Sequence, residues 1–107
     1  MSASSASFED AIRRLENAWD FPDGVFFRLR QGDYDPEGID AVVKFLRSLT
    51  VDDDVLMPRR FVSLTWWIPT FMEWQEGRVA EAGGDAEALK QHAVQVRNAL
   101  DELLGVP

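Results

Sequence analysis

The stretch "DYDPEG" places oxygen ligands at the spacing found in calcium loops of the EF-hand type. The residues that fit the first ligand positions and the central glycine of such a loop are Asp33, Asp35, Glu37 and Gly38. Lys44, however, stands where the loop needs a bidentate carboxylate, so a cation replaces the final ligand. Pro36 also suits the first position of a helix, and we therefore expect a helix start and no metal site here.

Other chemistry has few candidates. His92 is the only histidine, and no G-x-S-x-G context accompanies it, so we interpret it as a surface or boundary residue. The chain has no cysteine, which excludes a thiol nucleophile and thiolate-bound zinc. Close carboxylate pairs are unavoidable with 19 acidic residues in 107, so their proximity does not indicate acid–base catalysis. We expect no enzyme activity and no cofactor.

The charge of the chain indicates what kind of partner it can take. The net charge is −8, which repels phosphate backbones and favours a partner with a basic surface. The densest acidic run is Asp52–Asp54, and Asp40 adds to the acids of "DYDPEG". A solvated loop is the alternative interpretation of this run.

The segment "SLTWWIPTFMEW" holds three of the four tryptophans. Adjacent helical residues point about 100° apart, so a small domain cannot bury all of these aromatic rings. We expect one or two of Trp66, Phe71 and Trp74 to be partly exposed beside Glu73 and Glu76. Such rings with a charged rim are typical of a protein-binding hot spot.

Apolar spacing of three and four residues predicts the helices that position these groups. The first runs from about Phe8 to Trp19 after a Ser7 cap, and the last follows an Asp85 cap and ends before Gly105. Between them, Asp35 and Pro36 begin a helix that ends near Thr50. The run "VFFRLR" fits either a strand or one to two helical turns, with the helix favoured by its flanking residues.

A helical pattern also covers residues 58–82, although Pro69 falls inside it. Proline removes one backbone hydrogen bond, so this segment is either one kinked helix or two abutting helices. Because it is apolar nearly all round, we predict an all-α bundle of four or five helices built around it. We expect residues 7–107 to form one domain and residues 1–6 to form a disordered tail.

Nothing in the chain predicts secretion or a membrane span. No pattern of a signal peptide is visible in the first residues, and the longest apolar-rich run, Phe61–Met72, is shorter than the about 20 residues that span a bilayer. We therefore expect a cytoplasmic protein.

The chain resembles small helical immunity proteins of bacterial toxin systems, especially those of contact-dependent growth inhibition. The resemblance lies in the segment "VFFRLRQGDYDPEG", the helix expected after it, and the segment "VSLTWWIPTFMEWQ". The resemblance implies a cytoplasmic inhibitor that occludes its cognate toxin, often a nuclease with a basic cleft. Immunity families differ in fold, so no site residue is carried over from them.

These observations predict an immunity protein that neutralises a toxin domain by covering a basic surface. The predicted partner-binding residues are the carboxylates and aromatic anchors named above: Asp33, Asp35, Glu37, Asp40, Asp52, Asp53, Asp54, Trp66, Glu73, Trp74 and Glu76. The alternatives are a helical homodimer, or a domain that binds a small molecule, through the tryptophan-rich face.

Overall fold

The computed structural model describes residues 5–107, and all of its regular elements are helices. They are α1 (Ser5–Asp20), α2 (Val25–Arg30), α3 (Pro36–Ser48), α4 (Arg59–Trp66), α5 (Ile68–Trp74), α6 (Glu76–Glu81) and α7 (Ala86–Leu104). The prediction of an all-α domain is confirmed. Counting α4–α6 as one interrupted rod gives five helices, as the sequence predicted.

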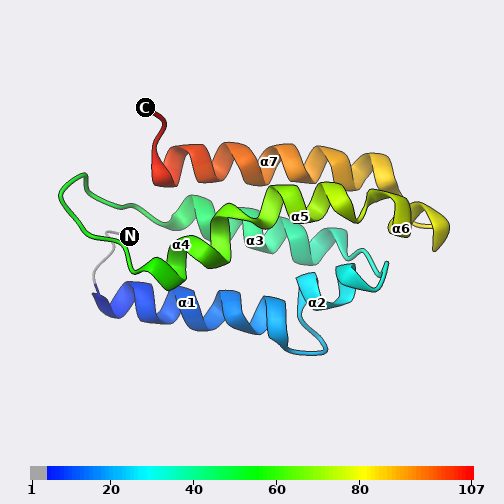
Figure 1. Ribbon diagram of the computed structural model, residues 1–107, viewed down its shortest axis with the longest axis horizontal. Helices are drawn as coiled ribbons and strands as arrows, with labels where there is room; N and C mark the ends of the chain where they lie inside the picture. Colours follow the sequence, from blue (N-terminus) through cyan, green and yellow to red (C-terminus); the bar gives the residue numbers. More distant parts are fainter. Residues whose placement is uncertain (1–4) are drawn as a thin grey trace.

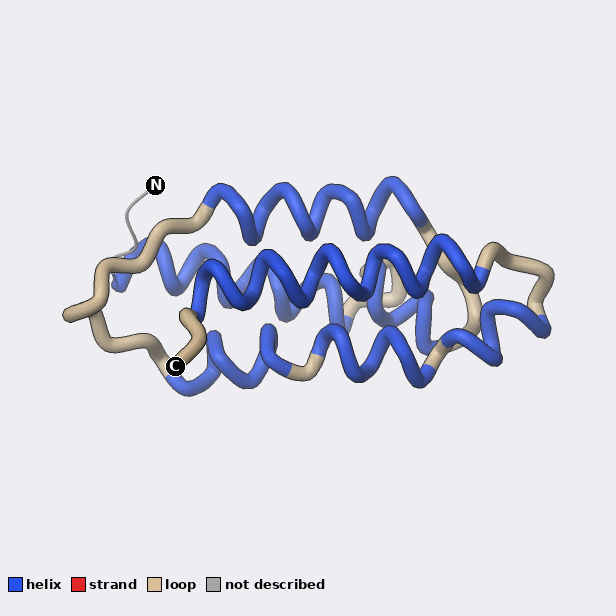
Figure 2. The backbone as a smooth tube through the Cα atoms, turned by 90° about the horizontal axis from the view of Figure 1, so that it is seen from above, coloured by secondary structure: helices blue, strands red, loops and turns tan. Residues whose placement is uncertain are grey.

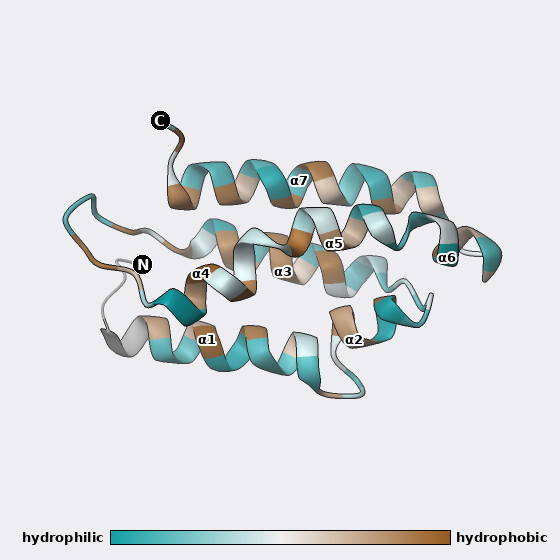
Figure 3. Ribbon diagram, in the orientation of Figure 1, coloured by the Kyte–Doolittle hydropathy of each residue, from teal (hydrophilic) through white to brown (hydrophobic). Residues whose placement is uncertain are grey.

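Helices α1, α3 and α7 and the line of α4–α6 run side by side in an elongated body of 44 × 29 × 20 Å (Figure 1). Helix α7 lies between α3 and the interrupted line of α4–α6, as the view from above shows (Figure 2). Helix α1 packs against α2 and α4. Hydrophobic and hydrophilic residues alternate along the long helices in the pattern of amphipathic helices (Figure 3).

The helix ends follow the predicted caps at Asp35, Asp85 and Gly105. Asp35 Oδ1 accepts the Gly38 N–H at 3.1 Å, and Asp85 Oδ1 accepts the Ala88 N–H at 3.0 Å. Gly105 ends α7 with a φ of 83°, where glycine avoids the strain of a side chain. The prediction of a Ser7 cap is wrong, because α1 already begins at Ser5. Residues 1–4 of the tail predicted for residues 1–6 lie outside the described residues, whereas residues 5 and 6 belong to α1.

The ambiguous run Val25–Arg30 forms a helix. Its buried residues are Val25, Phe26 and Leu29, the set expected of a helix and not of a strand. The turn before it brings Gly24 against the end of α1, where a Cβ atom would lie 2.3 Å from the Asn17 carbonyl oxygen. Only glycine allows this close approach, which reverses the chain and packs α2 against α1.

The tryptophan-rich segment is broken twice. Helix α4 ends at Trp66 and α5 begins at Ile68, so Pro69 separates two abutting helices. A second break at Gln75, which the sequence did not predict, divides α5 from α6. The rod contacts α1 through α4 and α7 through α5 and α6, so it connects two sides of the bundle.

A core tryptophan compensates for the first break. The last carbonyls of a helix have no donor within the helix, and proline supplies none. Trp19 is 9% exposed, and its indole Nε1–H donates to the Leu64 carbonyl at 3.0 Å. The Trp19 ring also packs against Phe26 and Phe71, with both centroids at 4.7 Å. This one side chain therefore joins α1, α2, α4 and α5.

Replacing Trp19 with phenylalanine should lower the free energy of unfolding by about 1–3 kcal/mol, because the buried Leu64 carbonyl loses its donor. Equilibrium urea unfolding measures this change. Trp74→Phe is the matched control and should change stability by less than about 0.5 kcal/mol, since Trp74 is 69% exposed. Equal effects of the two substitutions would contradict the role of the indole donor.

Candidate functional site

The two predicted acidic clusters lie at opposite ends of the molecule. Asp33–Asp40 surrounds the connection from α2 to α3, and Asp52–Asp54 lies in the connection from α3 to α4 (Figure 1). Helix α3, with 13 residues, separates them by about 20 Å. The structure therefore does not join these carboxylates into one surface.

Internal contacts occupy part of the first cluster. Arg28 Nε lies 2.8 Å from Asp33 Oδ2, and Arg28 Nη1 lies 3.3 Å from Asp35 Oδ2. The hydrogen bond to Asp33 is the main reason why the pKa of Arg28 is raised, and the same bond lowers the pKa of Asp33. Asp35 also caps α3, whereas Glu37 is exposed. These acids mainly stabilise the start of α3.

Asp40 belongs to a chain of side chains that crosses from α3 to α7. His92 Nε2 lies 3.0 Å from Asp40 Oδ1, and the Tyr34 hydroxyl is hydrogen-bonded to His92 Nδ1. A neutral His92 with its proton on Nε2 would donate to Asp40 and accept from Tyr34. The arrangement resembles a proton relay in its order of groups, with Tyr34 at the place of the nucleophile.

The electrostatics of Tyr34 oppose that use. Burial, followed by the charges of Asp85 and Asp40, raises the pKa of Tyr34 to about 12. A nucleophilic or basic tyrosine needs the opposite shift, because only the ionised oxygen attacks. We therefore assign Tyr34, His92 and Asp40 to a cross-link between the start of α3 and α7. Sequence reasoning did not single out Tyr34, since nothing local in the chain places it beside residue 92.

Three tryptophans form the most distinctive surface feature. Trp66, Trp67 and Trp74, here called the tryptophan row, pack edge to face with centroids 5.3 Å and 5.0 Å apart. Trp66 is 56% exposed and Trp74 is 69% exposed, whereas Trp67 is half-buried. Phe71, the third aromatic residue expected near the surface, is buried. The break at Trp67 lets the row lie along the outside of α4 and α5.

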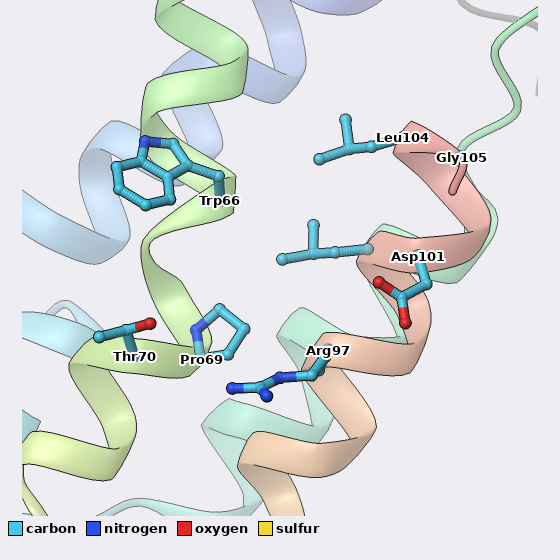
Figure 4. Close-up of a pocket in the computed structure, with 8 residues that line it drawn as sticks. Trp66, Pro69, Thr70, Arg97, Asp101, Leu104 and Gly105 are labelled. Carbon is cyan, nitrogen blue, oxygen red and sulfur yellow. The ribbon is translucent and has the colours of Figure 1, made fainter. Parts of the chain in front are cut away.

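A groove borders the row on the side of α7. This α5–α7 groove has a volume of about 410 Å³ and is lined by Trp66, Pro69, Thr70, Arg97, Leu100, Asp101, Leu104 and Gly105. Figure 4 shows Trp66 and Pro69 on one wall and Arg97, Asp101 and Leu104 on the other. The groove is open and has a mixed polar and apolar lining, with two charged groups on one wall.

The predicted acids next to the row have different environments. Glu73 Oε1 lies 2.8 Å from Arg97 Nη2 and connects α5 to α7. Glu76 is partly buried, and its Oε1 atom accepts no hydrogen bond from the described residues. Glu73 therefore belongs to the rim of the groove, and Glu76 does not form an open acidic rim.

The opposite side of the row has two arginines and one acid, Asp20. A smaller hollow of about 230 Å³ lies between Trp19 and Trp67 and includes Arg30 and Arg60. The Arg30 guanidinium lies over the Trp19 ring, 5.9 Å from its centroid, and Arg60 pairs with Glu16 at 2.9 Å. The tryptophan row thus has charged groups of both signs around it, as is usual for the rim of an interface.

The end of α7 connects the groove to the second acidic cluster. Leu104 and Gly105 line the α5–α7 groove and also a neighbouring hollow that contains Asp52, Asp53 and Glu102. The structure therefore brings the predicted anchor Trp66 and part of the predicted Asp52–Asp54 run to adjoining hollows. Sequence reasoning missed Asp101 and Glu102, the acidic residues of α7 that contribute. The signal that could have found them is the last turn of α7, which contains no basic residue.

Neither a metal site nor a membrane span is found in residues 5–107. No group of three or more His, Asp or Glu side chains in this range could hold a metal ion. None of the described helices combines the length and the apolarity needed to cross a membrane.

Comparison with known proteins finds no matching family, no matching curated protein and no matching solved structure. The likeness to immunity proteins therefore remains a prediction from the sequence.

The single tyrosine of the chain provides a direct test of the cross-link. Because its pKa is raised to about 12 in the folded protein, above about 10 in an unfolded chain, the neutral phenol contributes stability that is complete below pH 10. This contribution should be lost as the pH rises from about 10 towards 12. The tyrosinate absorbance of the folded protein should therefore appear near pH 12, and that of the denatured protein near pH 10. A folded-state midpoint near 10 would show a solvated hydroxyl.

Proposed function

We propose that this chain is a binding protein that docks another protein on its tryptophan row. The observation that carries the proposal is the exposure of Trp66 and Trp74, 56% and 69%, in a packed aromatic row beside an open groove. Tryptophan is among the residues that contribute most binding energy at protein interfaces. A row already packed edge to face loses little side-chain freedom when a partner covers it.

The surroundings of the row favour a protein over a small molecule. The α5–α7 groove and the hollow near Arg30 are open and lie on either side of the row. Ligand pockets of proteins usually enclose most of their ligand, whereas these hollows offer an extended surface with charged groups at its edges. A protein partner can cover both hollows and the row at once.

The identity of the partner is suggested by charge and by the sequence resemblance. A chain with a net charge of −8 associates fastest with a positively charged surface. The likeness to immunity proteins supports a toxin domain, with a nuclease as the type whose active-site cleft is basic. In this proposal the chain acts as an inhibitor by steric occlusion, and Asp52–Asp54 contributes to the attraction before contact.

The partner can be sought among the products of neighbouring genes. Co-expression with an adjacent toxin-like domain should give a 1:1 complex and restore growth. In that complex, Trp66→Ala and Trp74→Ala should each raise the dissociation constant at least about tenfold, which corresponds to about 1.4 kcal/mol. Isothermal titration calorimetry of the purified proteins measures this change.

Phe21→Ala is the matched control, because Phe21 is a 53% exposed aromatic residue in a different hollow, between α1 and α3. It should leave the affinity unchanged. If Phe21→Ala weakens the complex and the tryptophan variants do not, the proposed site is wrong. If sedimentation shows a dimer of this chain that dissociates in the tryptophan variants, the homodimer replaces the proposal.

The charge contribution can be tested by association rates. Replacing Asp53 and Asp54 with asparagine should slow association with the toxin domain and reduce its dependence on salt, because long-range attraction is screened by ions. Stopped-flow measurements at two salt concentrations give both quantities. Glu81→Gln with Glu87→Gln removes two charges elsewhere and controls for net charge; an equal effect of both pairs would assign the attraction to the whole chain.

A further inference from the structure

We propose that the α5–α7 groove receives an arginine side chain of the partner, held against Trp66 and by the carboxylate of Asp101. This inference rests on the proposed function, because it names the group of the partner that the tryptophan row would bring into the groove. It adds a second contact, which is electrostatic, to the aromatic anchor.

The walls of the groove fit the apolar part of an arginine. Trp66 and Pro69 lie on the side of α4 and α5, and Leu100 and Leu104 lie on the side of α7. Arginine covers apolar surface with its methylene chain while its charged group stays at the edge. Its flat guanidinium also stacks on aromatic rings, and Trp66, which lines the groove, is an exposed aromatic residue.

Asp101 supplies an acid that has no cation of its own. The natural partner on α7 is Arg97, four residues earlier, but the Arg97 guanidinium is bound to Glu73 at 2.8 Å. Among the described residues, no side chain forms an ion pair or a hydrogen bond with the Asp101 carboxylate. Figure 4 shows both Arg97 and Asp101 on the groove side of α7. The pairing of Arg97 thus leaves one negative charge in the groove.

The end of helix α7 increases this negative potential. Its last turn contains Asp101 and Glu102 and no basic residue, although a helix C-terminus favours cations. The Gly105 N–H bonds the Asp101 carbonyl at 3.0 Å, and the following carbonyls of the helix have no donor within it. A guanidinium has five N–H donors, enough to reach a carboxylate and these carbonyls together. An ammonium presents a point charge and lacks the flat face that packs against Trp66.

The probe is a blocked tripeptide with a central arginine, titrated into the isotope-labelled full chain and followed by NMR. We expect saturable shifts of the Trp66 indole N–H and of the backbone amides of Asp101 and Leu104. The same peptide with citrulline, which keeps the shape of arginine without its charge, should bind at least about threefold more weakly. A lysine peptide should also bind more weakly than the arginine peptide.

Two variants separate the groove from general charge attraction. Asp101→Asn should weaken binding of the arginine peptide at least about threefold, whereas Glu87→Gln, which removes one charge from the other end of α7, should not. Asp101 and Glu87 are both exposed, so neither substitution disturbs the core. Spectra of the free variants show whether the remaining signals keep their positions.

Several results would overturn the inference: equal binding of arginine and citrulline peptides, equal effects of the two variants, or shifts that avoid Trp66. Equal binding of the lysine peptide would overturn the choice of a guanidinium. The proposed function fails separately, because it depends on the affinity of Trp66→Ala and Trp74→Ala for the whole partner. A partner that needs Trp74 but is indifferent to Asp101→Asn would keep the proposed function and remove the arginine from the groove.

Discussion

The hydrogen bond from the Trp19 indole to the Leu64 carbonyl is the contact on which the rest of the arrangement depends. Pro69 prevents one continuous helix from residue 59 onwards, and a break in a buried helix leaves carbonyl groups that must find donors. Trp19 supplies a donor from α1 and fills the space between α2 and α5 with its ring. The same break changes the direction of the chain, and this change gives the tryptophan row its place outside the core.

Both signs of charge surround the tryptophan row, and their pairing decides which groups remain available. Glu73 binds Arg97, and Glu16 binds Arg60. These pairs connect helices and fix the rim of the surface. The net charge of −8 is therefore a weak guide to the site, since a local excess of acid near the end of α7 arises from pairing as well as from composition.

Much of the fold could be predicted because its signals are local. Asp35 and Asp85 accept the N–H groups expected of helix caps, and the apolar spacing of α3 and α7 matches their buried faces. Ser7 was misassigned because residues 5 and 6 are also compatible with a helix. The break at Gln75 could not be predicted, because no proline lies near it and the apolar spacing stays helical across it.

By itself the sequence determined the class of fold, the caps of α3 and α7, the break near Pro69 and an excess of aromatic rings too large for the core. Only the tertiary structure decided that Trp66 and Trp74 lie outside while Phe71 lies inside, because burial depends on which helices cover a face. It also separated the Asp33 and Asp52 clusters and placed Asp101 across the α5–α7 groove from Trp66. These neighbours are far apart along the chain, so only the packing of α4 and α5 against α7 brings them together.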